Sequence, residues 1–137
     1  MKTKKQNKVI WYLREDTDTK KGQSIKNQEI SLMDYCTRNK MEILKIFSDY
    51  SDGNTLDRAE WKKLEAFLSD HKSEKITLLV SNFNRCTRRF FDAIQIIHLM
   101  HETGTTLIET ETGKDITNLF YKHTLEFVLN DIKLKMK

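Results

Sequence analysis

Short apolar runs alternate along this chain with stretches in which apolar residues recur at helical spacing. The apolar runs predict strands over Lys8–Leu13, Glu42–Phe47, Ile76–Val80 and Thr105–Thr110. The helical spacing predicts helices over about Ser24–Asn39, Asp57–Asp70 and Arg88–Thr103. This alternation is typical of an α/β domain: three layers, with a mostly parallel sheet of four to five strands between flanking helices.

Particular residues indicate where these helices begin, end and face the core. Ser24 is a good N-cap, Asp57 with Glu60 resembles a capping box, and Gly104 is suited to a C-cap. The apolar residues expected to face the core are Ile25, Leu32, Met33 and Cys36 in the first helix, Trp61, Leu64 and Leu68 in the second, and Phe90, Phe91, Ile94, Ile97 and Met100 in the third.

The last segment, about Asp115 to Lys137, is predicted to be a long helix with two apolar stripes. One stripe contains Ile116, Phe120 and Phe127, and the other contains Leu125, Leu129, Ile132 and Met136. A terminal helix that packs only on its own domain needs one stripe. The second stripe predicts a partner, most simply another copy of this chain; the alternative is a deeply docked helix.

Length and composition fit one domain, with a polar tail over residues 1–7, a body over 8–114 and the helix of 115–137. The 137 residues carry a formal charge of +4, which permits contact with nucleic acid but does not require it. Cys36 and Cys86 lie far apart, so neither a disulfide framework nor a zinc site is expected, and a reducing cytoplasm fits best. No apolar run is long enough to span a membrane, and residues 1–7 do not resemble a signal peptide.

The stretch after the predicted strand Ile76–Val80 holds the main candidate chemistry. A polar turn over residues 81–84 leads to Arg85 and Arg88 at the start of the next helix. Ligands of open α/β sheets bind beyond the carboxyl ends of the strands, and a helix N-terminus with guanidinium groups suits a phosphate. The alternative is that these arginines are solvated charges at a helix start.

Other constellations suggest different chemistry. His98 and His101 lie three residues apart on one helix, but no carboxylate completes a metal site on that face. A cluster of Asp16, Asp18, Asp49 and Asp52 at the sheet edge would suit Mg²⁺, although nearby arginines argue against it. There is no Gly-rich nucleotide-binding pattern. Most aromatic residues occupy core-like positions, so we expect no exposed platform for stacking single-stranded nucleic acid.

Four short motifs, taken together, resemble the catalytic domain of the serine recombinases, the resolvase/invertase family. Tyr12-Leu13-Arg14-Glu15-Asp16 is similar to the family's Y-x-R-x-S, and Gln23-Ser24 with Gln28 opens the first helix. Asp49, Asp52-Gly53 and Arg58 are similar to the D…SG…RP segment, and Asn84-Arg85-Cys86-Thr87-Arg88 is similar to D-R-x-x-R. The resemblance covers nearly the whole chain from Val9 and implies a resolvase-like fold.

The resemblance implies a specific reaction and partner. In this family a serine hydroxyl attacks a phosphate of double-stranded DNA and forms a covalent protein–DNA link, without a metal ion or cofactor. The arginines that match the family's catalytic positions are Arg14, Arg58, Arg85 and Arg88, and the other residues expected to line the site are Tyr12, Gln28, Asp49, Asp52 and Asn84. Without a metal, guanidinium groups must stabilise the charge on the phosphate oxygens.

The departures from the family pattern concern the same site. Asp16 stands at the position of the nucleophilic serine, where a carboxylate would repel the DNA phosphate, and Thr17 is the nearest hydroxyl. Asn84 replaces an acidic residue, and Ala59 replaces a proline. Two functions follow as hypotheses for a protein of a bacterial mobile element or phage: a site-specific recombinase, or a non-catalytic dimeric partner that binds DNA or an active recombinase.

Overall fold

The structure is a computed structural model that describes residues 7–16, 24–51 and 55–118. Its five strands are β1 (Lys8–Glu15), β2 (Glu42–Tyr50), β3 (Thr77–Val80), β4 (Thr106–Glu109) and β5 (Lys114–Asp115). Its helices are α1 (Ile25–Arg38), α2 (Ala59–Asp70) and α3 (Phe90–Thr103), with 3-10 turns η1 (Lys72–Glu74) and η2 (Phe83–Arg85). The strands form one sheet in the order β2-β1-β3-β4-β5, in which only β5 is antiparallel to its neighbour.

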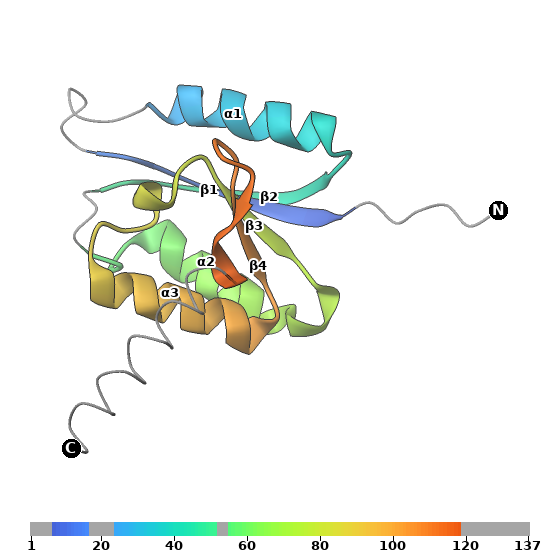
Figure 1. The fold of residues 1–137 in the computed structure, drawn as a ribbon. Coiled ribbons are helices and arrows are strands. Elements are labelled where there is room, and N and C mark those ends of the chain that lie inside the picture. The colour runs from blue at the N-terminus through green and yellow to red at the C-terminus, as the bar shows by residue number, and fades with distance from the viewer. Residues whose placement is uncertain (1–6, 17–23, 52–54, 119–137) are drawn as a thin grey trace, which may run out of the picture.

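Helices cover both faces of the sheet, as the sequence predicted. Figure 1 shows α1 above the sheet, and α2 and α3 below it. On one side of β1, Val9, Trp11 and Leu13 pack with Leu32 and Cys36 of α1. On the other side, Ile10 and Tyr12 belong to the core that contains Trp61, Leu64 and Ile97. Burial on both faces explains why β1 has an uninterrupted apolar run in place of alternation.

The predicted caps are confirmed for α1 and α3, and wrong for α2. The Ser24 hydroxyl accepts the N–H of Asn27 at 3.2 Å, and Gly104 ends α3 with a φ of +66°. The N-cap residue of α2 is Arg58, whose side chain makes no capping hydrogen bond. Asp57 instead pairs with Lys62, at an oxygen–nitrogen distance of 2.5 Å. The N-terminus of α2 is capped from a distance, by Asp49 of β2, as described below.

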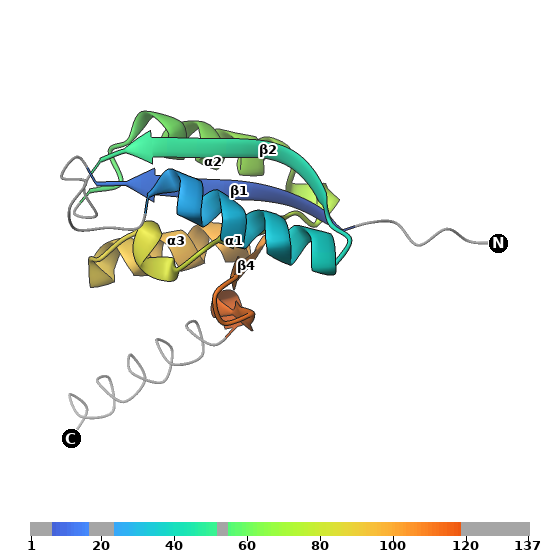
Figure 2. The same ribbon diagram turned by 90° about the horizontal axis from the view of Figure 1, so that it is seen from above.

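The expected core face of α3 is wrong at its first turn. Phe90 and Phe91 are 53% and 71% exposed, and Ile94 is half-buried, as the sheet covers Ala93, Ile96, Ile97 and Met100. Figure 2 shows the reason: this end of α3 lies past the arrowheads of β1 and β2, beyond the strands that would cover it. In α1, Met33 is likewise 50% exposed, although it was expected to face the core.

The chain ends fall largely outside the described residues. Of the predicted tail, only Asn7 is described, and the helix predicted over 115–137 is described only as far as Asn118. Asp115 itself lies in β5, a strand too short for its pattern to predict. Within the described residues, no helix is long and apolar enough to cross a membrane. Cys36 and Cys86 are both buried and free.

Candidate functional site

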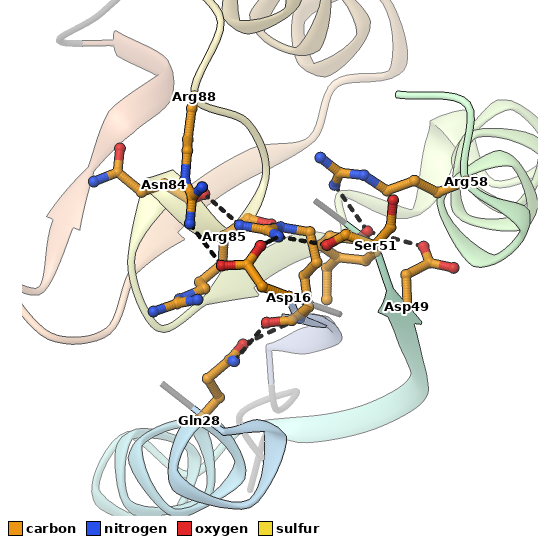
Figure 3. Close-up of polar contacts among 10 residues, drawn as sticks. Asp16, Gln28, Asp49, Ser51, Arg58, Asn84, Arg85 and Arg88 are labelled. Carbon is orange, nitrogen blue, oxygen red and sulfur yellow. Dashed lines mark hydrogen bonds and ion pairs between the residues drawn. The ribbon is translucent and has the colours of Figure 1, made fainter. Parts of the chain in front are cut away.

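The candidate site lies where the carboxyl ends of β1 and β2 meet the turn after β3. β1 has β2 on one side and β3 on the other, and the connections through α1 and α2 cross opposite faces of the sheet. This is the switch point at which open α/β sheets bind ligands. Figure 3 shows the polar side chains gathered there, with Arg85 and Arg88 on one side of Asp16 and Arg58 on the other.

Arg14 is fully buried and joins three segments of the site. Its Nη1 donates to Asp16 Oδ1 and to the carbonyl of Ser51, the latter at 2.6 Å. Its Nε donates to the carbonyl of Arg85 at 3.0 Å, and its Nη2 donates to the carbonyl of Asn84 at 3.3 Å. Arg14 therefore fixes the positions of the loops that carry the other arginines, and these bonds use four of its five N–H donors.

The side chain of Gln28 holds the backbone of Arg14 in place. Gln28 is fully buried; its Oε1 accepts the N–H of Arg14 at 3.2 Å, and its Nε2 donates to the carbonyl of Arg14 at 2.7 Å. This side chain thus supplies both hydrogen bonds that a neighbouring strand would make. The family resemblance indicated Gln28 as a site-lining residue, and the structure places its side chain against the backbone of Arg14.

Asp16 is an ionised carboxylate held between two guanidinium groups. Besides the bond to Arg14, its Oδ2 accepts from Arg88 Nη2 at 2.7 Å, and the residue is only 6% exposed. Burial acts to raise the pKa of Asp16, but the hydrogen bonds and charges of Arg14 and Arg88 prevail and lower the pKa below its ordinary value. The position expected for the nucleophile is therefore filled by an anion that two arginines bind.

Tyr12, Asp49 and Arg58 form a second buried network beside the first. The Tyr12 hydroxyl donates to Asp49 Oδ2 at 2.8 Å and accepts from Arg58 Nη1 at 3.0 Å. The two Asp49 oxygens also accept the backbone N–H groups of Glu60 at 3.0 Å and Trp61 at 2.9 Å, which caps α2. Burial raises the pKa of Tyr12, so its hydroxyl stays protonated. This network fixes Arg58 at the start of α2.

Three guanidinium donors of the site are buried without a hydrogen-bond partner among the described residues. They are Nε and Nη2 of Arg58 and Nη1 of Arg85. Arg58 is only 3% exposed, and burial, with the charges of Arg14 and Arg88, lowers the pKa of Arg85. Leaving such donors unpaired is costly, roughly 1–3 kcal/mol each and more for charged groups. The arrangement is suited to an oxyanion, and a phosphate diester has the oxygens to satisfy these donors.

Nine of the ten residues expected at the site lie in these contacts, and Asp52 falls outside the described residues. Asn84 contributes its backbone carbonyl to Arg14, while the residue itself is exposed. Sequence reasoning missed Ser51, whose carbonyl also binds Arg14. No sequence signal could have found it, because every residue has a carbonyl group.

The carboxylates of this edge do not form a metal site in the part of the chain that the structure describes. There, no three His, Cys, Asp or Glu side chains gather closely enough to hold an ion. Asp16 and Asp49 belong to the two separate networks above, and Asp18 and Asp52 lie outside the described residues. His98 is exposed and pairs with Glu102 at 3.1 Å, so a carboxylate does lie on that helix face, contrary to expectation, but among the described residues the two do not form part of a three-ligand group.

Comparison with known proteins identifies the family. Residues 9–130 match the family model described as the resolvase N-terminal domain. The chain belongs to this family of serine recombinases. The resemblance read from the four motifs is thereby confirmed, and this recombinase domain has its arginines where the fold brings β1, β2 and η2 together. A search of curated proteins found no match.

Solved structures show the same fold. The chain is similar to the N-terminal catalytic domain of TP901-1 integrase, with 20% identity, a TM-score of 0.76 and coverage of 96% of this chain and 99% of that one. It is also similar to a resolvase family site-specific recombinase from Streptococcus pneumoniae, with 19% identity, a TM-score of 0.70 and coverage of 96% and 93%. For the catalytic domain of ISC1926 TnpA, an IS607-like serine recombinase, the identity is 20%, the TM-score 0.65 and the coverage 75% and 70%.

Proposed function

We propose that this domain binds the phosphate backbone of double-stranded DNA and acts in site-specific recombination for a bacterial mobile element or phage, as a partner that does not itself cut DNA. The observation that carries the proposal is the set of buried, unpaired donors on Arg58 and Arg85 beside the partly exposed Arg88. Such donors suit phosphate oxygens. Membership of the resolvase family supports DNA as the source of the phosphate.

Asp16 argues against strand cleavage by the chain as it stands. To attack a phosphodiester, its carboxylate would have to leave two arginines, approach another anion and form a labile acyl phosphate. The nearby hydroxyl of Tyr12 is fully buried and protonated. The rival function, recombination by strand cleavage and rejoining, is favoured by the four retained arginines and needs a different nucleophile.

DNA binding is tested by titrating the full chain into a labelled duplex over a range of salt concentrations. If the arginines bind phosphates, affinity should fall steeply with salt, and Arg85→Ala should weaken binding on all sequences and reduce the slope of log affinity against log salt by about 1. Arg38→Ala is the matched control, because Arg38 is an exposed arginine on α1, paired with Asp34 at 3.0 Å. Binding that is absent or insensitive to salt would overturn the proposal.

Cleavage is tested separately, by searching for a covalent protein–DNA adduct under denaturing conditions. The native chain is compared with Asp16→Ser on DNA that flanks the gene. An adduct with Asp16→Ser alone supports an intact arginine site that has lost its nucleophile. An adduct with the native chain would show that it is an enzyme and would overturn the non-cutting proposal.

We also propose that the partner is a second copy of the chain, bound through residues 115–137, or an active recombinase that carries an equivalent segment. The two apolar stripes of this segment support the proposal. Sedimentation should show a dimer for the full chain and a monomer for a version that ends at Asn118. That end point keeps Thr117, whose Oγ1 accepts the N–H of Leu107 at 3.1 Å. Equal masses for the two proteins would contradict this dimer.

A further inference from the structure

Two exposed aromatic rings lie at the start of α3, where the sequence had predicted core residues. Phe90 is 53% exposed and Phe91 is 71% exposed. Their ring centroids are 6.0 Å apart and their planes meet at 68°, an edge-to-face contact that leaves ring surface open to solvent. Two exposed phenylalanines do not contribute the stabilising free energy that burial of their rings would give, so their position needs a physical reason.

The neighbours of these rings are cationic. Phe90 and Phe91 follow Arg88 by two and three residues, and Arg89 lies between, with a side chain that is 58% exposed. Arg88 is part of the proposed phosphate site through its contact with Asp16. The side chain of Arg89, the N-cap residue of α3, makes no capping hydrogen bond. The N-terminus of α3, which is the positive end of the helix dipole, therefore lies next to the two rings. The aromatic pair therefore extends the arginine site along its surface.

We infer that Phe90 and Phe91 form a stacking surface for an unpaired nucleobase next to the phosphate that the arginines bind. This inference rests on the proposed function and narrows it: the favoured partner is DNA in which a base is unpaired at this point. Aromatic rings beside a basic groove bind single-stranded nucleic acid through stacking, which every base can provide. Stacking of this kind gives little sequence preference.

Charge is the reason for choosing nucleic acid over a protein surface. A protein that covered the two rings would also have to cover Arg88 and Arg89, which pair with Asp16 and Asp92 but whose side chains are still 44% and 58% exposed. Removing these guanidinium groups from water is costly unless the bound partner brings anions of its own. A nucleotide provides the two required groups at adjacent positions, since its phosphate meets the arginines and its base meets the rings. Contact of the two rings with a protein is the alternative, and the experiment below distinguishes it.

The test compares three labelled DNAs of equal length by fluorescence anisotropy with the full chain: an intact duplex, a duplex with a one-nucleotide gap opposite an unpaired base, and a single strand. The native chain should bind the gapped duplex at least about 5-fold more tightly than the intact duplex, the gain typical of one stacked base. Phe90→Ala with Phe91→Ala should abolish that preference and leave binding to the intact duplex unchanged.

Conservative variants separate stacking from simple apolar contact. Phe91→Trp should keep the preference for the gapped duplex, whereas Phe91→Leu, which stays apolar without a ring, should lose it. Ile30→Ala is the matched control, because Ile30 is 62% exposed but lies on α1. The unpaired base is replaced by 2-aminopurine as a second readout, and its fluorescence should fall on binding to the native chain alone, not to the double alanine variant.

The outcomes also distinguish this inference from the function on which it rests. Salt-dependent binding that Arg85→Ala weakens, with equal affinity for gapped and intact duplexes, would overturn the stacking surface and leave the phosphate site standing. No binding to any of the three DNAs would overturn both. A double alanine variant that keeps the gap preference but sediments at a lower mass would show that the rings contact protein, which also overturns the inference.

Discussion

The carboxylate of Asp16 lies 2.7 Å from Nη2 of Arg88, and its second oxygen accepts a hydrogen bond from Arg14. Two guanidinium groups thus bind a small anion inside the cluster to which the family resemblance assigns the DNA phosphate. Guanidinium groups bind carboxylate and phosphate with the same fork-like geometry. We therefore propose that Asp16 takes the place of the phosphate in the absence of DNA, and that a bound phosphate shares Arg88 with it.

Replacing Asp16 by asparagine should strengthen DNA binding. The change keeps the size of the side chain, removes one negative charge beside the phosphate and frees Arg88, so we expect affinity to rise roughly 10-fold at low salt. Asp34→Asn is the control, since Asp34 is an exposed carboxylate that pairs with Arg38 away from the site. Anisotropy titrations measure both. An Asp16→Asn protein that binds DNA no better than the native chain would contradict the shared use of Arg88.

The same variant should change how stability depends on pH. The folded protein lowers the pKa of Asp16 below its ordinary value of 3.8, so Asp16 contributes stability at pH values above that number. The contribution is lost as pH falls through the lowered pKa. Urea unfolding between about pH 2.5 and pH 6 should thus show a smaller acid-dependent loss for Asp16→Asn than for the native chain. If the free energy of unfolding changed with pH in parallel for the two proteins, Asp16 would have the same pKa in the folded and unfolded states, which would contradict the prediction.

The layered fold could be predicted because burial on both faces leaves a direct mark on composition. The run from Val9 to Leu13 is apolar throughout, and such runs occur in strands between two helical layers. Helical spacing likewise gave the buried face of α2. Periodicity does not say where a sheet ends, so it placed Phe90 and Phe91 in the core although both are exposed. The end of α3 to which they belong extends past the arrowheads of β1 and β2.

The site was predictable in its residue types and less so in its contacts. The motifs brought Arg14, Arg58, Arg85 and Arg88 to one edge, since parallel strands end together. They did not show that the N–H groups of Arg14 donate to backbone carbonyl groups, because backbone acceptors have no sequence signature. Nor could local sequence reveal the cap of α2, whose carboxylate lies 11 residues before the N–H that it accepts.

Arg14 and Arg88 should respond differently to the same substitution by lysine. The guanidinium of Arg14 is fully buried and binds one carboxylate and three carbonyl groups, a fork that an ammonium group cannot reproduce. Arg14→Lys should lower the free energy of unfolding by about 3 kcal/mol or more. Arg88 has a side chain that is 44% exposed, so Arg88→Lys should cost less than about 1 kcal/mol. Equal losses in urea unfolding would refute this division of roles.

The capping role of Asp49 should be visible in stability, since the residue is only 7% exposed and its carboxylate accepts three hydrogen bonds. Asp49→Ala removes the cap of α2 and leaves the Tyr12 hydroxyl without its acceptor, so we expect a loss of about 2–4 kcal/mol in the free energy of unfolding. Because Tyr12 also holds Arg58, the variant should bind DNA more weakly even where it is fully folded.

Asp57→Ala is the matched control for that prediction. Asp57 is the residue that the capping-box pattern favoured, yet its exposed carboxylate pairs only with Lys62 among the described residues. Surface pairs of this kind contribute little, so the loss of stability should be much smaller than the loss caused by Asp49→Ala. Thermal and urea unfolding of the two variants side by side measure the difference. If Asp57→Ala proved as destabilising as Asp49→Ala, the helix would be capped locally after all, and the link from β2 through Asp49 to Arg58 would fail.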